Sequence, residues 1–328
     1  MYVTTAETRG GILVAVVSGG RPKLADRPTH KFLSALSSAG VRDIVWSVSD
    51  VDAPGYESDG HELAVYPRQW AVEYAADHWM QSTPPQPDAF LGAFPGREWA
   101  CREAERRGCW AVLQLDDNII RLGMMRGTAS GRKIIAATGG LGLFVDLFAA
   151  VALSTNARTV GAQLYAVVLH RSDWKVARTG FPYSCFLERV GNGREPWFGP
   201  FEDDITHSFQ YGTRADGVTT ALMPILLYDK EPRSKSGMRA HYNNERSVQL
   251  QRMFPESARI GVRATHANGR GTPRIFHSMA RNAIKNPLVV RDPILFGRAK
   301  DRMAELADMW REAEAQSSRD KILRRTGG

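Results

Sequence analysis

The clearest pattern in the chain is a series of short apolar runs that alternate with stretches of helical spacing. Residues 11–17 are continuously apolar and rich in β-branched side chains, which predicts a strand buried on both faces. Residues 29–39 carry apolar side chains at helical spacing, and Gly40 ends that helix. A second strand is predicted at 43–50. This strand–helix–strand order indicates a βαβ unit and hence a parallel sheet.

Further apolar runs and helical stretches continue this alternation along the chain. The pattern predicts strands at residues 61–66, 110–115, 162–171 and 218–227, and helices at 70–80, 96–108, 133–153, 203–211 and 302–323. A proline-rich loop is expected at 82–88. The predicted fold class is α/β: one Rossmann-like domain over residues 1–290, with a mostly parallel central sheet flanked by helices. A charged C-terminal helix and tail over residues 291–328 are expected as decoration of that domain.

The composition is that of an ordinary globular protein, and the positive net charge predicts an anionic partner. The chain has 328 residues, 43% of them hydrophobic and 24% charged, which is enough to bury a large core. Its formal net charge is +8, and basic residues far outnumber acids over residues 233–285. Nucleic acid, a nucleotide and an anionic membrane all fit such a charge.

Cysteine usage and apolar content favour the cytoplasm. The three cysteines, Cys101, Cys109 and Cys185, form no closely spaced pair, which argues against a disulfide framework or a zinc site. No leader pattern is recognised near the N-terminus. The most apolar stretch, residues 139–154, contains Asp146 and is too short to span a bilayer. We therefore expect a soluble, cytoplasmic protein that acts without a membrane. The oligomeric state stays open.

Two acidic clusters carry the main chemical signal, and the first follows a strand. Asp116, Asp117 and Asn118 come directly after the apolar run at 110–115. Carboxylates at the end of a buried strand are costly unless a cation neutralises them. The usual cation is Mg²⁺ or Mn²⁺, which takes oxygen ligands and often binds a substrate diphosphate. The first cluster is therefore predicted to bind a metal ion and a diphosphate.

The second acidic cluster lies at the start of the helix predicted at 203–211 and comprises Glu202, Asp203 and Asp204. The loop before it is rich in turns and aromatic residues, which is typical of a loop that shapes a binding cleft; its aromatic side chains are Trp197, Phe198 and Phe201. A carboxylate in this place can take the proton from an acceptor hydroxyl. The structural alternative is an acidic cluster that only stabilises the helix dipole.

Two further strand ends carry candidate ligand-binding residues. Ser18, Gly20 and Arg21 follow the first strand, and Asp50 ends the second. Glycine lets a ligand approach the backbone, arginine pairs with phosphate or stacks on a base, and aspartate accepts a hydrogen bond from a base or ribose. Ligands of open α/β sheets bind at the carboxyl ends of the strands, so these residues and Asp116 are expected on one edge. A plain turn and a helix cap are the alternatives for Gly20 and Asp50.

One histidine is expected to complete an oxygen-rich metal site. His277, at the end of a short apolar run, is favoured over His241 and His266. Three familiar signatures are missing from the sequence: GxxxxGK[ST], GxGxxG after the first strand, and GxSxG. Their absence disfavours a P-loop, a dinucleotide-binding fold and a serine hydrolase.

Taken in order, these features resemble a GT-A glycosyltransferase over residues 12–277. The resemblance implies a GT-A-like fold whose first strand and glycine loop hold the nucleotide base, together with the acid Asp50. It implies that residues 116–118 form the Asp-x-Asp-like motif for the metal and the diphosphate, with His277 completing the metal site. It also implies that the cluster at 202–204 supplies the catalytic base.

A closer resemblance rests on residues 92–104, 113–119 and 201–205, which are similar to the TET/JBP-associated glycosyltransferases. That family is encoded mainly by bacteriophages and is associated with adding sugars to 5-hydroxymethylcytosine in DNA. The resemblance implies DNA as the acceptor, a role for the basic region, and the host cytoplasm as the compartment if the protein is viral. Asn118 departs from the GT-A motif, which often has an acid there, and this leaves Asp117 as an alternative metal ligand.

The resulting hypothesis is metal-dependent transfer of a hexose, with glucose from UDP-glucose as the expected donor, to a hydroxymethyl group on a flipped-out DNA base. Arg97 is expected to contact the donor diphosphate, with a solvated helix face as the alternative. Asp203 or Asp204 is expected to take the hydroxyl proton, by an inverting or a retaining route. Three alternatives stay open: a GT-A enzyme acting on a glycan, lipid or small molecule, a nucleotidyltransferase, and a DNA-binding module with a decayed site.

Overall fold

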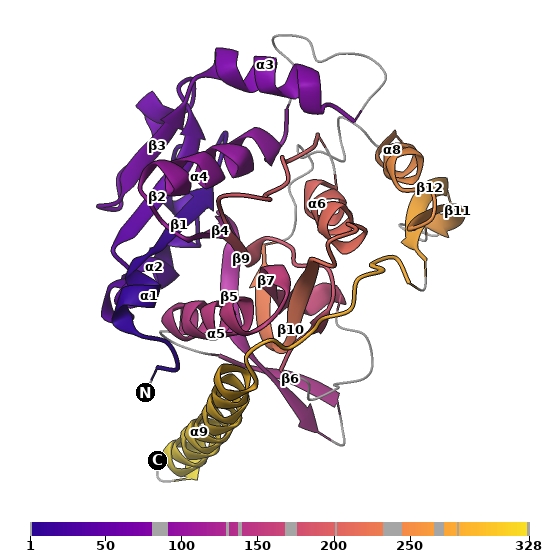
Figure 1. Cartoon of the computed structure of the whole chain (residues 1–328). Coiled ribbons are helices and arrows are strands. Elements are labelled where there is room, and N and C mark those ends of the chain that lie inside the picture. The colour runs from indigo at the N-terminus through magenta and orange to yellow at the C-terminus, as the bar shows by residue number, and fades with distance from the viewer. Residues whose placement is uncertain are drawn as a thin grey trace.

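The computed structural model gives a mixed α/β protein built around one large twisted sheet (Figure 1). It describes residues 2–80, 91–128, 131–136, 140–167, 176–200, 202–231, 245–265, 272–280 and 282–326. The loop predicted at 82–88, together with Phe201, His241 and His266, lies outside these ranges.

The central sheet has ten strands, nine of them in the order β3-β2-β1-β4-β9-β7-β10-β5-β6, and β8 pairs with β10 off this path. The strands are β1 (Ile12–Val17), β2 (Asp43–Ser49), β3 (Glu62–Tyr66), β4 (Ala111–Asp116), β5 (Ile119–Thr128), β6 (Gly131–Ala136), β7 (Ala157–Leu164), β8 (Arg178–Thr179), β9 (Cys185–Arg189) and β10 (Thr219–Lys230). A separate hairpin is formed by β11 (Ala258–Thr265) and β12 (Thr272–Met279).

Strand directions confirm the predicted parallel core and add antiparallel pairs. The neighbours β3, β2, β1 and β4 are parallel, as are β7 and β10. Strand β9 is inserted antiparallel between β4 and β7, and β5 pairs antiparallel with β10 and β6. The carboxyl ends of β1, β2 and β4 therefore meet at one edge, as the strand pattern predicts.

Helices cover both faces of the sheet. The helices are α1 (Ala6–Gly10), α2 (His30–Ser38), α3 (Arg68–His78), α4 (Phe94–Arg106), α5 (Gly140–Ser154), α6 (Asp203–Gly212), α8 (Glu245–Met253) and α9 (Pro293–Thr326), with 3-10 turns η1 (Leu24–Asp26), η2 (Ala53–Gly55) and η3 (Tyr165–Val167). Strand β1 is buried on both sides: Ile12, Val14 and Val16 pack in the core of α2 and α5, while Leu13 and Ala15 face α4. This two-sided burial explains why the first strand is continuously apolar.

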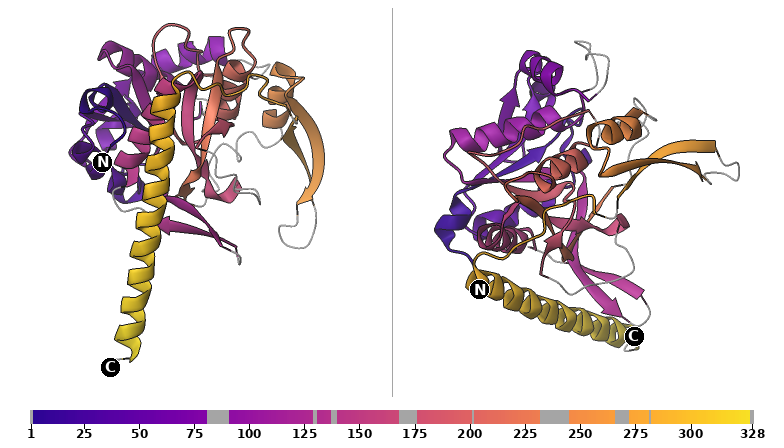
Figure 2. Two further views of the ribbon diagram at one scale, coloured as in Figure 1. Left: turned by 60° about the horizontal axis from the view of Figure 1, so that its bottom comes forward. Right: turned by 45° about the vertical axis from the view of Figure 1, so that its right-hand side comes forward.

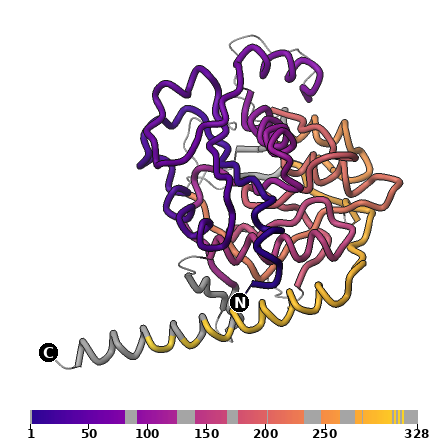
Figure 3. Tube along the Cα trace, turned by 60° about the vertical axis from the view of Figure 1, so that its left-hand side comes forward, coloured from indigo at the N-terminus to yellow at the C-terminus, as the bar shows by residue number. Residues whose placement is uncertain are grey.

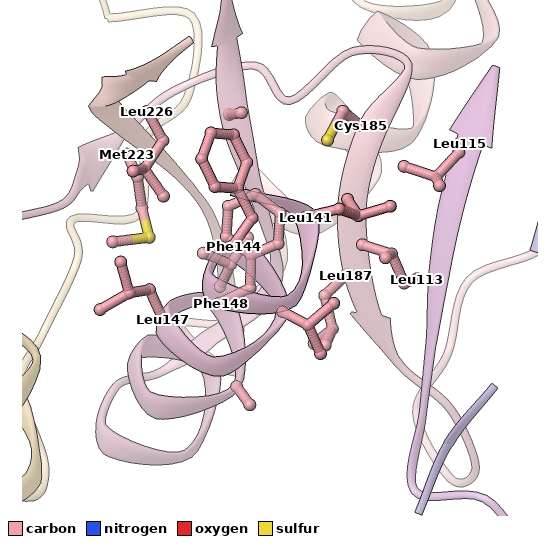
Figure 4. Packing of buried hydrophobic residues seen from close by; sticks show 14 of the residues in the cluster. Leu113, Leu115, Leu141, Phe144, Leu147, Phe148, Cys185, Leu187, Met223 and Leu226 are labelled. Atoms are coloured by element: carbon pink, nitrogen blue, oxygen red, sulfur yellow. The ribbon is translucent and has the colours of Figure 1, made fainter. Parts of the chain in front are cut away.

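The apolar helix α5 forms the centre of the main core. Phe144 and Phe148 project from it toward Leu113 of β4, Leu187 of β9 and Met223 of β10 (Figure 4). Its buried acid, Asp146, accepts hydrogen bonds from the backbone N–H groups of Val3 and Thr4 at 2.6 and 2.8 Å. The charge in this apolar helix therefore anchors the N-terminal segment of the described chain.

Two sequence-based boundaries are wrong. The helix predicted at 133–153 begins only at Gly140, because residues 131–136 form β6 and pair with β5. The strand predicted at 162–171 runs instead from Ala157 to Leu164 and is followed by a 3-10 turn. For the first stretch the apolar pattern suits a helix or a strand equally, and pairing with β5 decides between them.

The C-terminal helix α9 begins at Pro293, nine residues before the start predicted at residue 302, and so just after the expected domain boundary at residue 290. Its first turns contribute Ala299, Met303 and Leu306 to the main core, against α5. Figure 2 shows α9 then extending away from the body, and Figure 3 shows the same helix from the side of the N-terminal strands.

Candidate functional site

The carboxyl edge of the parallel strands gathers most of the residues that the sequence points to. The register pairs Val17 of β1 with Asp116 of β4, and the N–H of Ser18 donates to the carbonyl of Ser47 in β2. The glycine loop and the first acidic cluster are therefore neighbours across one pair of strands.

Asp116 is held by two cations. Its Oδ1 accepts a hydrogen bond from Nη2 of Arg97 at 2.9 Å, and its Oδ2 accepts from Nζ of Lys230 at 2.6 Å. Burial opposes ionisation of Asp116, but the charges of Lys230 and Arg97 outweigh burial and hold the pKa of this carboxyl well below its usual range. Asp116 is therefore a fixed anion in a cationic setting.

Arg97 links the two acidic clusters. Besides Asp116, it contacts the second cluster through Nε, which donates to Oδ2 of Asp203 at 2.8 Å. The side chain is only 3% exposed and lies 5.3 Å from the ring centre of Trp197 and 5.5 Å from that of Phe186. Burial disfavours its charge, but the carboxylates of Asp203 and Asp116 outweigh that effect and raise the pKa of Arg97. The alternative that Arg97 lies on a solvated helix face is therefore wrong, because its side chain is buried and joins the two acidic clusters.

Asp117 belongs to a second, smaller network with the glycine loop. Its Oδ2 accepts from Oγ of Ser18 at 2.6 Å, and its Oδ1 lies 3.3 Å from Nη1 of Arg21. Ser18 Oγ also lies 2.8 Å from the hydroxyl of Tyr56. Burial raises the pKa of Asp117 to about 6, against the opposing charge of Arg21.

The second acidic cluster stands at the start of α6. Glu202 adopts a left-handed backbone, with φ of 53°, and its Oε1 lies 3.9 Å from Nδ1 of His277. Asp204 is half-buried, and desolvation of its carboxyl together with the charges of Asp203 and Glu202 raises its pKa to about 8. Near neutral pH, Asp204 therefore keeps a proton that an ordinary aspartate would lose.

The charges of the site do not balance. Among the described residues of the site, five carboxylates face three cations; the acids are Asp116, Asp117, Glu202, Asp203 and Asp204, and the cations are Arg21, Arg97 and Lys230. The excess negative charge adds to burial, and both favour the protonated forms of Asp117 and Asp204.

Asp50 and Gly20 occupy different surroundings. Oδ1 of Asp50 accepts a hydrogen bond from the N–H of Arg68, the first residue of α3, at 2.8 Å. The acid at the glycine loop is instead Asp52, whose Oδ1 accepts from the N–H of Gly20 at 3.2 Å and whose Oδ2 accepts from Ser49. Asp52 was missed because it lies beyond the strand, in a turn that carries no periodic signal.

Lys230 is a second candidate residue that sequence reasoning missed. It lies at the end of β10 and also donates to Oγ of Ser184 at 2.7 Å. Its only signal is a lysine shortly after a predicted apolar strand. A role for this lysine can be inferred only from the topology, because β10 runs parallel to β7 and so ends at the edge where the acidic clusters lie.

The predicted metal ligands do not fit a metal ion as they are arranged. Both oxygens of Asp116 are engaged by Arg97 and Lys230, and both oxygens of Asp117 face Ser18 and Arg21. Within the described ranges, no group of three or more His, Cys, Asp or Glu residues is placed to hold a metal ion. The buried Oδ1 of Asn118 accepts no hydrogen bond from the described part of the chain. A requirement for Mn²⁺ or Mg²⁺ stays a prediction.

The aromatic loop before α6 is mainly a packing element. Trp197 is buried and stacks on His207 with ring centres 3.8 Å apart, and the His207 Nε2 lies 2.7 Å from Oε1 of Glu188. Phe198 meets His78 edge to face at 5.1 Å. Trp197 therefore supports α6 rather than presenting a surface on which a base could stack.

Comparison with known proteins leaves the family undetermined. No family model matches the chain, and no curated protein matches it. One similar solved structure, that of a mycobacterial protein, shares 11% identity, covers 83% of this chain and 86% of its own, and has a TM-score of 0.47. A similarity this distant carries no inference about function. Among the described helices, none has the length and apolar character needed to cross a membrane.

Proposed function

We propose that this protein is a GT-A-like glycosyltransferase that moves a sugar, with glucose expected, from a UDP-sugar to the hydroxymethyl group of 5-hydroxymethylcytosine in DNA. The observation that carries the proposal is the bridge of Arg97 between Asp116 and Asp203. It brings a candidate donor site at the ends of β1 and β4 against a candidate base at the start of α6. Transfer of a sugar from a nucleotide to a hydroxyl needs these two parts side by side.

The donor half of the proposed site combines the glycine loop with three cations. The Gly20 N–H, Ser18 and the partly exposed Arg21 lie where a nucleotide would meet the carboxyl edge of β1. Arg97 and Lys230 lie beside Asp116, where the diphosphate is expected. The buried Nη1 of Arg97 has no hydrogen-bond partner within the described chain, so it is one donor that a phosphate oxygen would satisfy.

The base half favours Asp204 over Asp203. One oxygen of Asp203 accepts a hydrogen bond from Arg97 at 2.8 Å, so only its other oxygen is available to an acceptor hydroxyl. Asp204 has the raised pKa that a general base needs near neutral pH. In the proposed inverting step, Asp204 takes the proton of the acceptor hydroxyl. The hydroxyl oxygen bonds to the anomeric carbon as the bond from that carbon to the diphosphate oxygen breaks, and UDP leaves.

DNA is proposed as the acceptor because of the family resemblance and the basic charge of the chain. A hydroxymethyl group on a paired base lies inside the duplex, so the base has to leave the stack to reach Asp204. A glycan, lipid or small-molecule acceptor would use the same donor half and would respond differently to DNA.

The test is transfer of radiolabelled sugar from UDP-glucose, and from a panel of other sugar nucleotides, with Mn²⁺ present. Hydroxymethylated duplex DNA should be labelled, and unmodified DNA should not. Asp204→Asn should lower kcat by roughly a hundredfold or more, whereas Asp77→Asn, an exposed acid on α3, should not. The wild-type rate should rise with pH and level off above about pH 8, since the Asp204 base must be deprotonated. Donor hydrolysis or transfer to other acceptors, with no labelling of DNA across the panel, would overturn the DNA assignment.

A further inference from the structure

Most of the net positive charge of the chain is accounted for by one segment. Residues 246–285 contain eight arginine or lysine residues and a single acid, Glu256. That segment has a formal net charge of +7, against +8 for the whole chain of 328 residues. The rest of the protein is therefore almost neutral, and any polyanion is attracted mainly to this segment.

Five of these eight cations belong to α8, β11 and β12, which together form a projecting unit that we call the basic arm; α8 also begins with Glu245. The two eight-residue strands pair antiparallel along their length, from Ala258 with Met279 to Thr265 with Thr272. Figure 2 shows the hairpin standing away from the central sheet. On its described surface, Arg252 and Arg259 are exposed, and the apolar side chains of Ile260 and Val262 are 43% and 67% exposed.

The basic arm is seated on the helix that carries the candidate base. Leu250 of α8 and Ala258 of β11 pack with Ile205 and Phe209 of α6 in one buried cluster. His277 of β12 also contacts Glu202 of the second acidic cluster, at the start of the same helix. A ligand on the arm is thus held in a defined position relative to α6 and to Asp203 and Asp204.

We propose that the basic arm binds duplex DNA and positions it over the start of α6; this inference rests on the proposed function for its choice of DNA. A two-stranded ribbon has its strands about 4.8 Å apart and fits the major groove, which is about 12 Å wide. Exposed arginine side chains such as that of Arg259 on β11 are suited to phosphate contacts, and such contacts release counterions. The near absence of acids in the segment removes the repulsion that a DNA backbone would otherwise meet.

The test compares two double variants of equal charge change. Arg252→Ser with Arg259→Ser removes two exposed cations from the arm, and Arg298→Ser with Lys300→Ser removes two exposed cations from α9, well apart from the arm in Figure 1. Affinity for a short fluorescent duplex is measured by anisotropy at several salt concentrations. The arm variant should bind at least about tenfold more weakly, and its plot of log affinity against log salt should be shallower by about 1.8. The α9 variant should bind like the wild type.

Each outcome bears on the arm separately from the enzyme. Equal DNA binding by the arm variant and wild type, or equal losses in both variants, would overturn the inference. So would tighter binding of the arm to phosphatidylserine vesicles than to DNA. Selective loss of DNA binding in the arm variant supports the inference even if no sugar is transferred. In that case the glycosyltransferase proposal fails while the DNA-binding arm stands.

Discussion

The neighbours of each acidic side chain in the site determine whether that acid is paired with a cation or has a raised pKa. Arg97 and Lys230 neutralise Asp116 and Asp203, whereas Asp117 and Asp204 are left with raised pKa values because burial and the excess negative charge favour their protonated forms. Asp116 is thus a fixed anion, whereas Asp117 and Asp204 exchange protons near neutral pH. That division assigns them different chemistry before any ligand is considered.

Replacing Arg97 by methionine should destabilise the fold strongly. The substitution leaves two carboxylates close together without the guanidinium that joins them, and losing one partner of a buried ion pair costs about 3–5 kcal/mol. Arg102→Met, one turn along α4 and 47% exposed, is the control, and its loss should be at most about 1 kcal/mol. The free energy of unfolding in urea measures both. A similar decrease in the free energy of unfolding for both variants would contradict a stabilising role for the Arg97 ion pairs.

Replacing Asp204 by asparagine should stabilise the protein increasingly as the pH rises. The pKa of Asp204 is about 8 in the folded chain and that of an ordinary aspartate when unfolded, so the folded state binds this proton more tightly. The stability that this proton contributes is lost as pH rises from about 4 to about 8. The amide of the asparagine variant does not titrate in this range, so the variant should exceed the wild type by about 1 kcal/mol or more at pH 8.

Urea unfolding at pH 5 and pH 8 checks this difference, with Asp77→Asn as the control at an exposed position. Asp117 also has a raised pKa, and its contribution is common to all three proteins. A constant gap between the Asp204→Asn variant and the wild type at both pH values would contradict the assignment of the raised pKa to Asp204.

Elements are positioned by which faces they bury. The helix α5 is buried almost all round because it lies between the sheet, α2 and α9, and this explains its unusually apolar sequence. Its start was misplaced in the sequence because strand β6, which precedes it, ends in the apolar residues Ile134, Ile135 and Ala136. Short strands such as β9 carry too few residues for a periodic signal, and their place in the sheet comes from pairing on both sides.

Removing the ring of Phe148 should open a cavity at the centre of the main core. Phe148 is fully buried and stacks edge to face on Phe144 with ring centres 5.9 Å apart. Phe148→Ala should cost about 3–5 kcal/mol. Leu153→Ala, on the same helix but 43% exposed, should change stability by about 0.5 kcal/mol or less. Equal midpoints in thermal unfolding for the two variants would show that α5 is not packed as described.

The whole molecule consists of the sheet body with two appended elements, the basic arm and α9. The arm is attached through α6 and so stays close to the candidate base, while α9 is attached through α5 on the core side. Both appendages lie in the last third of the chain, and they differ in charge and in the element that anchors them. The predicted division at residue 290 separates α9 in sequence, although its first turns complete the core of the body.

The docking of α9 can be tested with two methionines on the same helix. Met303 is buried against the main core, whereas Met309 is 54% exposed. Met303→Ala should cost about 2 kcal/mol or more, because it removes buried contacts and leaves a cavity. Met309→Ala should stay within about 0.5 kcal/mol of the wild type. If the two variants unfold at the same urea concentration, α9 is independent of the body.

The parallel α/β core and the candidate residues at its edge could be predicted from the sequence alone, because continuous apolar strands and helical periodicity are local properties. Ser18, Asp116 and Asp117 were identified in this way, since each directly follows or ends a recognisable strand. Local patterns cannot show which cation faces a given acid. The contacts of Lys230 and Arg97 with Asp116, the link of Arg97 to Asp203, and the place of Asp52 beside Gly20 depend on strands and helices that are distant in sequence. These pairings follow from the folded chain, because the order and direction of the strands bring their ends together.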